Sequence, residues 1–317
     1  MDIIMKKNAS MLTRTPVVCG IALLCCLLWG SAFPCVKIGY RLFSIAGDDT
    51  FSQLLFAGYR FTLAGVLVIL IGSLLERRFL LPKTSSWPMV IKLGCIQTIL
   101  QYVFFYIGLA HTTGVKSSII IASNVFLSIF ISAARFHEVL SAKKLLGCLI
   151  GFLGVILINL TGSGLDLNLS LSGEGAIFLS AAAYALSSTM VKRYSEKEDT
   201  FTLCGYQFFF GGIVLSLIGL SGGGTVAGFT PVSALLLLYM GMISAVAYSL
   251  WSLLLKYNPI GKVAVFGFSN PIFGVILSAL LLGEKNQAFT GKGLIALLLV
   301  CIGIFLVNRN GKTGEDN

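Results

Sequence analysis

Two asparagines occupy matching positions in strongly apolar parts of the sequence. Asn124 lies in the apolar run 116–134 and Asn270 in the run 262–282, each about eight residues from the start of its run. An amide inside a membrane span is costly unless it is hydrogen-bonded or hydrated, and such residues commonly mark a solute pathway. The pair therefore predicts either contacts to the polar end of a zwitterion or a tie between two helices.

Aromatic side chains and further amides occur in other apolar runs. One pattern of a hydroxyl residue followed by two aromatic residues recurs in both halves of the chain, as Thr98, Tyr102 and Phe105 and as Ser244, Tyr248 and Trp251. A cavity lined by rings and a few amides suits apolar or aromatic solutes with a polar head group, although rings at helical spacing also occur as ordinary packing. The residues predicted to contact substrate are Trp29, Ser31, Gln101, Tyr102, Asn124, Tyr184, Tyr248, Trp251 and Asn270.

The stretch WGSAFPCVKIGY carries a glycine, a serine and a proline inside an apolar run. Pro34 removes a backbone donor and perturbs the preceding turn, which frees carbonyl groups near Gly30. Free backbone groups in a membrane are tolerated where they face protein or a watery cavity. We therefore expect Trp29 and Ser31 to line the solute path, and Tyr184 matches Trp29 at an offset of 155 residues. In the alternative, the small residues only allow close helix packing.

Charged residues inside the apolar runs are rare. Arg60 is the only charge well inside a run, and it either holds a substrate carboxylate or ties helices together. The uncharged Gln207 at the matching position favours the structural role. Glu138 and Glu284 stand at helix ends beside lysines, where an acid can cap the following helix and form ion pairs at a gate. The residues assigned to structure or gating are Pro34, Arg60, Glu138, Pro271 and Glu284.

Composition indicates a membrane protein. Hydrophobic residues make up 56% of the chain and charged residues 11%, with a mean hydropathy of +0.91, whereas soluble domains carry about 25% charged residues. Apolar stretches of roughly 18 residues or more indicate membrane spans. The sequence predicts an all-α polytopic protein with ten spans: 16–36, 53–75, 89–110, 116–134, 143–161, 174–191, 202–220, 232–255, 262–282 and 290–307.

The net charge of +10 reflects topology rather than a nucleic-acid partner. With the N-terminus inside, most lysines and arginines fall in the two tails and the even-numbered connections, as the positive-inside rule requires. We therefore expect a multi-pass protein of the bacterial cytoplasmic (inner) membrane with both termini cytoplasmic. The first run is longer than the apolar core of a typical signal peptide, so we expect it to be retained.

The chain repeats itself at an offset of about 150 residues. An offset of 147 places GYRF (58–61) on GYQF (205–208). An offset of 146 aligns four pairs of identical residues: Lys116 with Lys262, Ser123 with Ser269, Asn124 with Asn270 and Glu138 with Glu284. The sequence thus predicts a first five-helix repeat over 1–165 and a second over 166–317, which ends in a short cytoplasmic tail. Because five is odd, the second repeat enters the membrane from the opposite side, an inverted arrangement typical of transporters.

Three segments carry a family resemblance: WGSAFPCVKIGY and the repeated blocks over 123–159 and 269–308. On these residues the chain resembles the ten-helix, EamA-type family of the drug/metabolite transporter (DMT) superfamily. The resemblance implies a basket of helices around a central cavity lined by spans 1, 3, 4, 6, 8 and 9, and export of amino acids and related metabolites. The first block has Val125 where the second has Pro271, and His137 where it has Gly283, so symmetric roles at these positions are not expected.

Taken together, these patterns predict a secondary, non-ATP transporter of small organic metabolites, above all amino acids or related zwitterions, that works by alternating access. The family resemblance implies that the direction of transport is export. No Asp or Glu lies in the middle of a span, which favours facilitated diffusion or exchange over carboxylate-based proton coupling. A multidrug or cationic-solute exporter and a non-transporting membrane subunit are the alternatives. No enzymatic activity, cofactor or metal is expected; the partners are a small-molecule substrate and the lipid bilayer, and a monomer suffices in principle.

Overall fold

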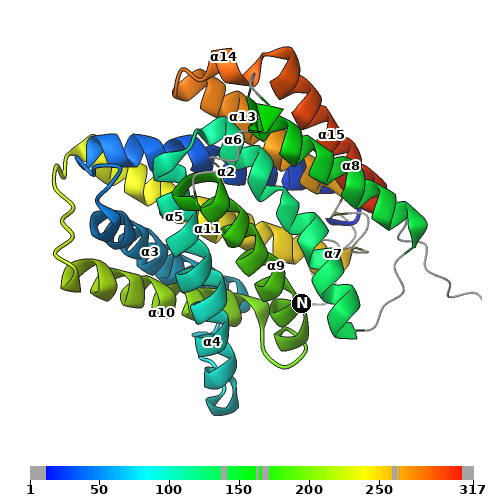
Figure 1. The fold of residues 1–317 in the computed structure, drawn as a ribbon. Helices are drawn as coiled ribbons and strands as arrows, with labels where there is room; N and C mark the ends of the chain where they lie inside the picture. The colour runs from blue at the N-terminus through cyan, green and yellow to red at the C-terminus, as the bar shows by residue number, and fades with distance from the viewer. Residues whose placement is uncertain are drawn as a thin grey trace, which may run out of the picture.

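The computed structural model describes residues 12–136, 141–161, 164–165, 171–258, 263 and 265–308, and almost all of them are helical. The first half contains α2 (Thr15–Leu42), α3 (Thr50–Glu76), α4 (Trp87–Leu93), α5 (Gln101–His111), α6 (Gly114–Ile121), α7 (Ser123–Phe136) and α8 (Ala142–Asn159). The second half contains α9 (Ala176–Tyr194), α10 (Thr200–Ser221), α11 (Pro231–Tyr257), α13 (Ser269–Leu281), α14 (Lys285–Ala288) and α15 (Gly291–Asn308). Figure 1 shows their arrangement.

Short irregular segments join or interrupt these helices. A 3-10 turn (Thr84–Ser86) precedes α4, and a π-helix (Gly94–Leu100) separates α4 from α5. A second π-helix (Leu171–Gly175) leads into α9, and a 3-10 turn (Val265–Phe268) leads into α13. Two two-residue strands, β1 (Leu160–Thr161) and β2 (Gly164–Leu165), pair antiparallel after α8.

The helices are those of a multi-pass membrane protein. Among the described residues, seven helical segments are long and apolar enough to cross a membrane. Two further apolar helices, over 266–281 and 291–307, are shorter. The segment predicted over 89–110 begins earlier, at Thr84, because the 3-10 turn, α4, the π-helix and α5 follow one another without a break.

Polar residues mark where the long helices begin. The side chain of Asp49 accepts a hydrogen bond from the Ser52 backbone N–H at the start of α3, and Asp199 does the same for Thr202 at the start of α10. Each cap satisfies one of the backbone donors that a helix N-terminus leaves free. At α11, Thr230 forms a capping box with the serine three residues on, and a proline occupies the first turn.

Glycines bring α3 and α10 into backbone contact along their whole length. The two helices lie side by side in Figure 1, and glycines recur on each at intervals of seven residues, at 58, 65 and 72 and at 205, 212 and 219. A side chain at Gly58, Gly65, Gly212 or Gly219 would collide with the backbone of the facing helix, and one at Gly205 would collide with the Ile69 side chain. The contacts run in opposite directions along the two helices: Gly58 meets Ser216, Gly65 meets Phe209 and Gly72 meets Phe201.

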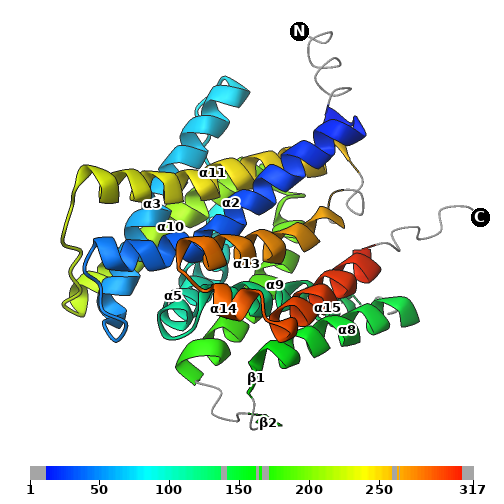
Figure 2. The ribbon, with the colours of Figure 1, turned by 90° about the horizontal axis from the view of Figure 1, so that it is seen from above.

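A second antiparallel pair is formed by α8 and α15, which lie against each other in Figure 2. Gly147 of α8 faces Val307 of α15, and Gly154 faces Ala296 and Val300. Helices in lipid are not driven together by the hydrophobic effect. Small residues at such crossings let the backbones approach closely, so that van der Waals packing holds the helices together.

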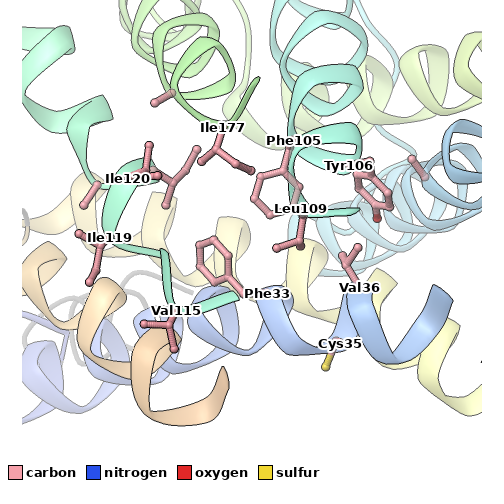
Figure 3. Packing of buried hydrophobic residues seen from close by; sticks show 14 of the residues in the cluster. Phe33, Cys35, Val36, Phe105, Tyr106, Leu109, Val115, Ile119, Ile120 and Ile177 are labelled. Carbon is pink, nitrogen blue, oxygen red and sulfur yellow. The ribbon is translucent and has the colours of Figure 1, made fainter. Parts of the chain in front are cut away.

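An apolar core joins α2, α5, α6 and α9. Figure 3 shows Phe33 of α2 beside Phe105 and Leu109 of α5, with Val115 of α6 and Ile177 of α9 around them. The rings of Phe33 and Phe105 are 5.7 Å apart, and all five side chains are buried. This core fixes the four helices that carry most of the residues predicted to contact substrate.

Candidate functional site

A chain of touching aromatic rings runs through the middle of the molecule. The ring of Trp29 on α2 lies 5.7 Å from Tyr248 and 5.2 Å from Trp251, both on α11. Tyr248 contacts Phe208 of α10 at 5.1 Å, and Phe208 stacks on Phe61 of α3 at 5.5 Å. Centroid distances of this kind are typical of favourable aromatic pairs. The predicted residues Trp29, Tyr248 and Trp251 are therefore neighbours.

Three tyrosines from three helices meet at this chain. Tyr102 on α5, Tyr184 on α9 and Tyr248 on α11 are close enough to one another to interact electrostatically. Tyr102 also lies against Phe61, with ring centroids 4.0 Å apart. Each of the three tyrosines is half-buried.

The packing of α6 and α7 against α9 places Asn124 at the same level as Tyr184. Near the start of both segments, Lys116 Nζ lies 3.0 Å from Glu174 Oε1, and further along the Ser128 and Ser188 hydroxyls are 3.3 Å apart. The segments therefore run in the same direction. Asn124 is one turn before Ser128 and Tyr184 one turn before Ser188, which puts the two residues at a similar level.

The crossing of α6 and α13 brings Asn270 to the same level. A side chain on Gly114 would meet Ser278, and one on Gly274 would meet Ser118, so the two helices are antiparallel. Continued along α13, this register brings Asn270 to the level of Ala122, at the end of α6 and two residues before Asn124. Both asparagines are half-buried, and the side-chain oxygen of Asn270 has no hydrogen-bond partner among the described residues.

Each asparagine is the second residue of a helix that follows a local break. The helix containing Asn124 starts at Ser123, after Ala122 has interrupted α6, and the helix containing Asn270 starts at Ser269, after a 3-10 turn. Discontinuous helices expose free backbone groups in the membrane, which transporters use to bind polar groups. Pro271, which is buried next to Asn270, is accommodated in the first turn of α13.

Two glutamines in the helical segment that ends with α5 are buried, and each has a side-chain oxygen that could still accept a hydrogen bond. Gln97 is 3% exposed and Gln101 is 6% exposed, and the side-chain oxygen of each lacks a hydrogen-bond donor among the described residues. Gln97 belongs to the π-helix, a feature that is frequent at functional sites. Contacts of Gly108 with Ile177 and of Tyr102 with Tyr184 make α5 antiparallel to α9, which puts Gln101 at the level of Tyr184.

Arg60 is fully enclosed between α3, α5 and α11. Its Nε donates to the Met240 carbonyl at 3.3 Å, and its two terminal nitrogens donate to Tyr106 Oη at 3.1 Å and Ser244 Oγ at 3.4 Å. The guanidinium also lies 6.0 Å from the ring centre of Tyr102. Arg60 therefore ties three helices together and borders the tyrosine cluster.

Ser31 and Pro34 are engaged in helix packing. The Ser31 hydroxyl donates to the Leu28 carbonyl at 2.7 Å and lies 2.9 Å from the Tyr239 hydroxyl, which links α2 with α11. Pro34 is buried inside α2, which continues as one helix to Leu42. A side chain on Gly30 would meet the backbone of α13. These contacts match the packing alternative for the serine more closely than the solute-path alternative.

Glu284 caps the N-terminus of α6 rather than the helix that follows Glu284 in the chain. Its carboxylate accepts hydrogen bonds from the backbone N–H groups of Gly114 at 3.1 Å and Val115 at 2.9 Å, at the start of α6, and lies 3.9 Å from Lys37 Nζ. It makes no side-chain cap on α14. The expected cap of the following helix was therefore wrong for this residue. Its counterpart Glu138 lies outside the described residues.

Comparison with known proteins decides the family. The model of the EamA-like transporter family matches residues 17–160 and again residues 171–309. The chain belongs to the EamA-like transporter family. An EamA-like protein of the DMT superfamily is a membrane transporter rather than an enzyme, as the sequence resemblance implied.

Relatives and a solved structure agree with this assignment. An uncharacterized transporter of Archaeoglobus fulgidus is 28% identical over 88% of this chain and 93% of its own length. The uncharacterized transporter YvbV of Bacillus subtilis is 26% identical over 90% of both chains. A WAT1-related chloroplastic protein of Arabidopsis thaliana is 24% identical over 88% of this chain and 66% of its own length. One protein crystal structure, at 18% identity, shares the fold with a TM-score of 0.65 over 94% of this chain and 99% of the other.

Proposed function

We propose that this EamA-like transporter moves amino acids or related zwitterions across the bacterial cytoplasmic membrane by alternating access, in the direction of export. The observation that carries the proposal is the convergence of Tyr102, Tyr184 and Tyr248 from three helices, each half-buried, near the level of Asn124 and Asn270.

The chemistry of this cluster suits a small amphipathic solute. Rings of Trp29 and the three tyrosines offer an apolar surface that also attracts an ammonium group through cation–π interactions. Amide oxygens of Gln101 and Asn270 that lack donors supply acceptors for the same ammonium. Such a mixture of rings and few polar groups is typical of small-molecule sites.

The packing of equivalent segments supports two inverted repeats, 1–165 and 166–317, of five spans each. The repeat-related helices α3 and α10 are antiparallel, and so are α8 and α15. α6, in the predicted span 116–134, is also antiparallel to α13, in the equivalent predicted span 262–282. Antiparallel contact between equivalent helices is what a two-fold axis in the membrane plane produces. Two such halves can exchange conformations and open a shared site to one face and then to the other.

Both termini are placed in the cytoplasm under this proposal, on the distribution of lysine and arginine. Transport proceeds by facilitated diffusion or exchange, since no acidic residue lies in the middle of a predicted span. The same lack of an acid disfavours a cationic-drug exporter, which commonly meets its cargo with a carboxylate.

Uptake into liposomes tests the proposed function. The purified protein is reconstituted, a mixed pool of amino acids, other metabolites and a lipophilic cation is offered outside, and trapped solutes are identified by mass spectrometry. We expect amino acids to accumulate above empty liposomes. The double variant Asn124→Ala/Asn270→Ala is expected to lose about tenfold or more of this uptake because two polar contacts to a charged solute are removed.

A matched control is Asn286→Ala, which changes an exposed asparagine of α14. This variant is expected to keep wild-type uptake. Accumulation of the lipophilic cation alone would favour the multidrug alternative. No accumulation of any solute, with or without a pH gradient, would contradict the transporter proposal for this substrate class.

A further inference from the structure

The two halves of the molecule make the same helix-to-helix contact with different residues. In one half, the Thr98 hydroxyl donates to the side-chain oxygen of Gln207. In the other half, Arg60 donates to the hydroxyl of Ser244 at 3.4 Å. Arg60 aligns with Gln207 at an offset of 147 residues, and Thr98 aligns with Ser244 at an offset of 146. A neutral amide therefore suffices for this contact, and the positive charge of Arg60 is not needed for it.

The charge of Arg60 has no opposite charge beside it. Arg60 is 2% exposed, and neither of the ion pairs found among the described residues involves it. Its neighbours are neutral: the Met240 carbonyl and the Tyr106 and Ser244 hydroxyls. A buried guanidinium without a counter-charge is costly, so a charge that the helix contact does not require points to a partner that arrives from outside the chain.

The guanidinium has the donors and the position to meet such a partner. Arginine carries five N–H groups, and the three hydrogen bonds within the described structure leave two of them for a ligand. The guanidinium lies 6.0 Å from the ring centre of Tyr102, which interacts with Tyr184 and Tyr248. It thus stands at the edge of the tyrosine cluster.

We propose that Arg60 binds the carboxylate of the transported solute and makes the transporter selective for carboxylate-bearing molecules. This inference rests on the proposed function and adds a specificity-determining residue to it. The fork of a guanidinium matches a carboxylate in charge and in geometry. The amide oxygens of Gln101 and Asn270 that lack donors would then receive the ammonium end, so that the two charges of a zwitterion are recognised separately.

The variant Arg60→Gln tests this role because it installs the side chain that the other half already uses for the same helix contact. Wild-type and variant proteins are reconstituted and offered an equimolar mixture of L-phenylalanine and phenethylamine, its decarboxylated analogue, together with the mixed metabolite pool. We expect the variant to lose about tenfold or more of the uptake of carboxylate-bearing solutes, including L-phenylalanine, while uptake of amines without a carboxylate stays within about twofold. Arg60→Lys, which keeps the charge, is expected to retain part of the preference.

A second variant separates selectivity from helix packing. Thr98→Val breaks the equivalent contact with Gln207 and should lower the uptake of both solute classes equally or not at all. Two results would overturn the inference while leaving transport intact. In the first, Arg60→Gln takes up carboxylate-bearing solutes to within about twofold of the wild-type level. In the second, the wild-type protein accumulates only solutes without a carboxylate. An equal loss of both classes in Arg60→Gln would assign Arg60 to structure alone. No uptake by wild-type protein would instead refute the proposed function on which the inference rests.

Discussion

Glu198 shows how one buried acid joins two connections outside the membrane spans. Its carboxylate accepts hydrogen bonds from the backbone N–H of Lys83 at 2.9 Å and of Asp199 at 3.1 Å, and the side chain is 7% exposed. Burial alone would raise the pKa of Glu198. Hydrogen bonds from Ser86 and from the two backbone N–H groups, together with the charge of Lys83, outweigh burial and hold the pKa below its ordinary value of 4.5.

The lowered pKa predicts a defined pH dependence of stability. Because the folded protein holds the proton of Glu198 less tightly than the unfolded chain, the carboxylate stabilises the fold above pH 4.5, and this contribution is lost as the pH falls through the lowered pKa. Glu198→Gln should therefore unfold about 1–2 kcal/mol more easily at neutral pH and match the wild type in strong acid. Thermal unfolding in detergent across this pH range measures the difference.

The exposed neighbour Glu196 provides the control for that measurement. Glu196→Gln should leave the unfolding temperature unchanged at each pH. A constant gap between Glu198→Gln and wild type from neutral to strongly acidic pH would contradict the role given to the Glu198 carboxylate.

At the scale of single residues, the sequence predicts the position of a side chain where that position depends only on spacing within one helix. Tyr102 and Tyr248 stand at equivalent positions of a recurring pattern, and the structure brings them together. Glu284 could not be placed in the same way. Its partners, Gly114 and Val115, are about 170 residues away along the chain, and no local pattern indicates which helix end an acid will reach in the folded protein.

The glycine positions of α3 and α10 lead to a prediction at the scale of helices. A side chain on Gly65 would collide with the backbone N and Cα of Phe209, so the two helices would have to separate. We expect Gly65→Ala to lower the free energy of unfolding by about 1–3 kcal/mol. Alanine has a higher helix propensity than glycine, but this gain is smaller than the cost of separating the helices. Thermal unfolding in detergent, followed by circular dichroism, measures the change.

Gly20 of α2 is the matched control because a side chain there meets no atom within 4 Å. Gly20→Ala should be neutral or slightly stabilising. If Gly65→Ala were as stable as Gly20→Ala, the close approach of α3 and α10 would not contribute to the fold as described.

The helices themselves could largely be predicted from apolar length, but their local breaks could not. The glycine interval of seven residues is visible in the sequence at 58, 65 and 72 and again at 205, 212 and 219, and it signals the contact between α3 and α10. By contrast, nothing in the composition of Gly94–Leu100 distinguishes a π-helix from an α-helix. That segment is set by its packing: Gly94 lies against Phe210 of α10, and Thr98 lies against Gly211.

At the scale of the whole molecule, α3 is antiparallel to α10 and α8 to α15, as the proposed inverted repeats require. A site shared by two such halves should become accessible from each side of the membrane in turn. The cysteines of the natural sequence lie mostly buried, so a single introduced cysteine can report this accessibility once the natural ones have been replaced.

Under the proposed mechanism, Asn124 lies on a path that opens alternately to the two faces of the membrane. The measurement is labelling of Asn124→Cys, in an otherwise cysteine-free protein in oriented liposomes, with a membrane-impermeant thiol reagent added to one side or the other. Leu149→Cys, on the exposed apolar face of α8, is the control and should be labelled from neither side. We expect Asn124→Cys to be labelled from both sides, and transported amino acids to slow the labelling. Labelling from one side only, or from neither, would contradict the proposed mechanism.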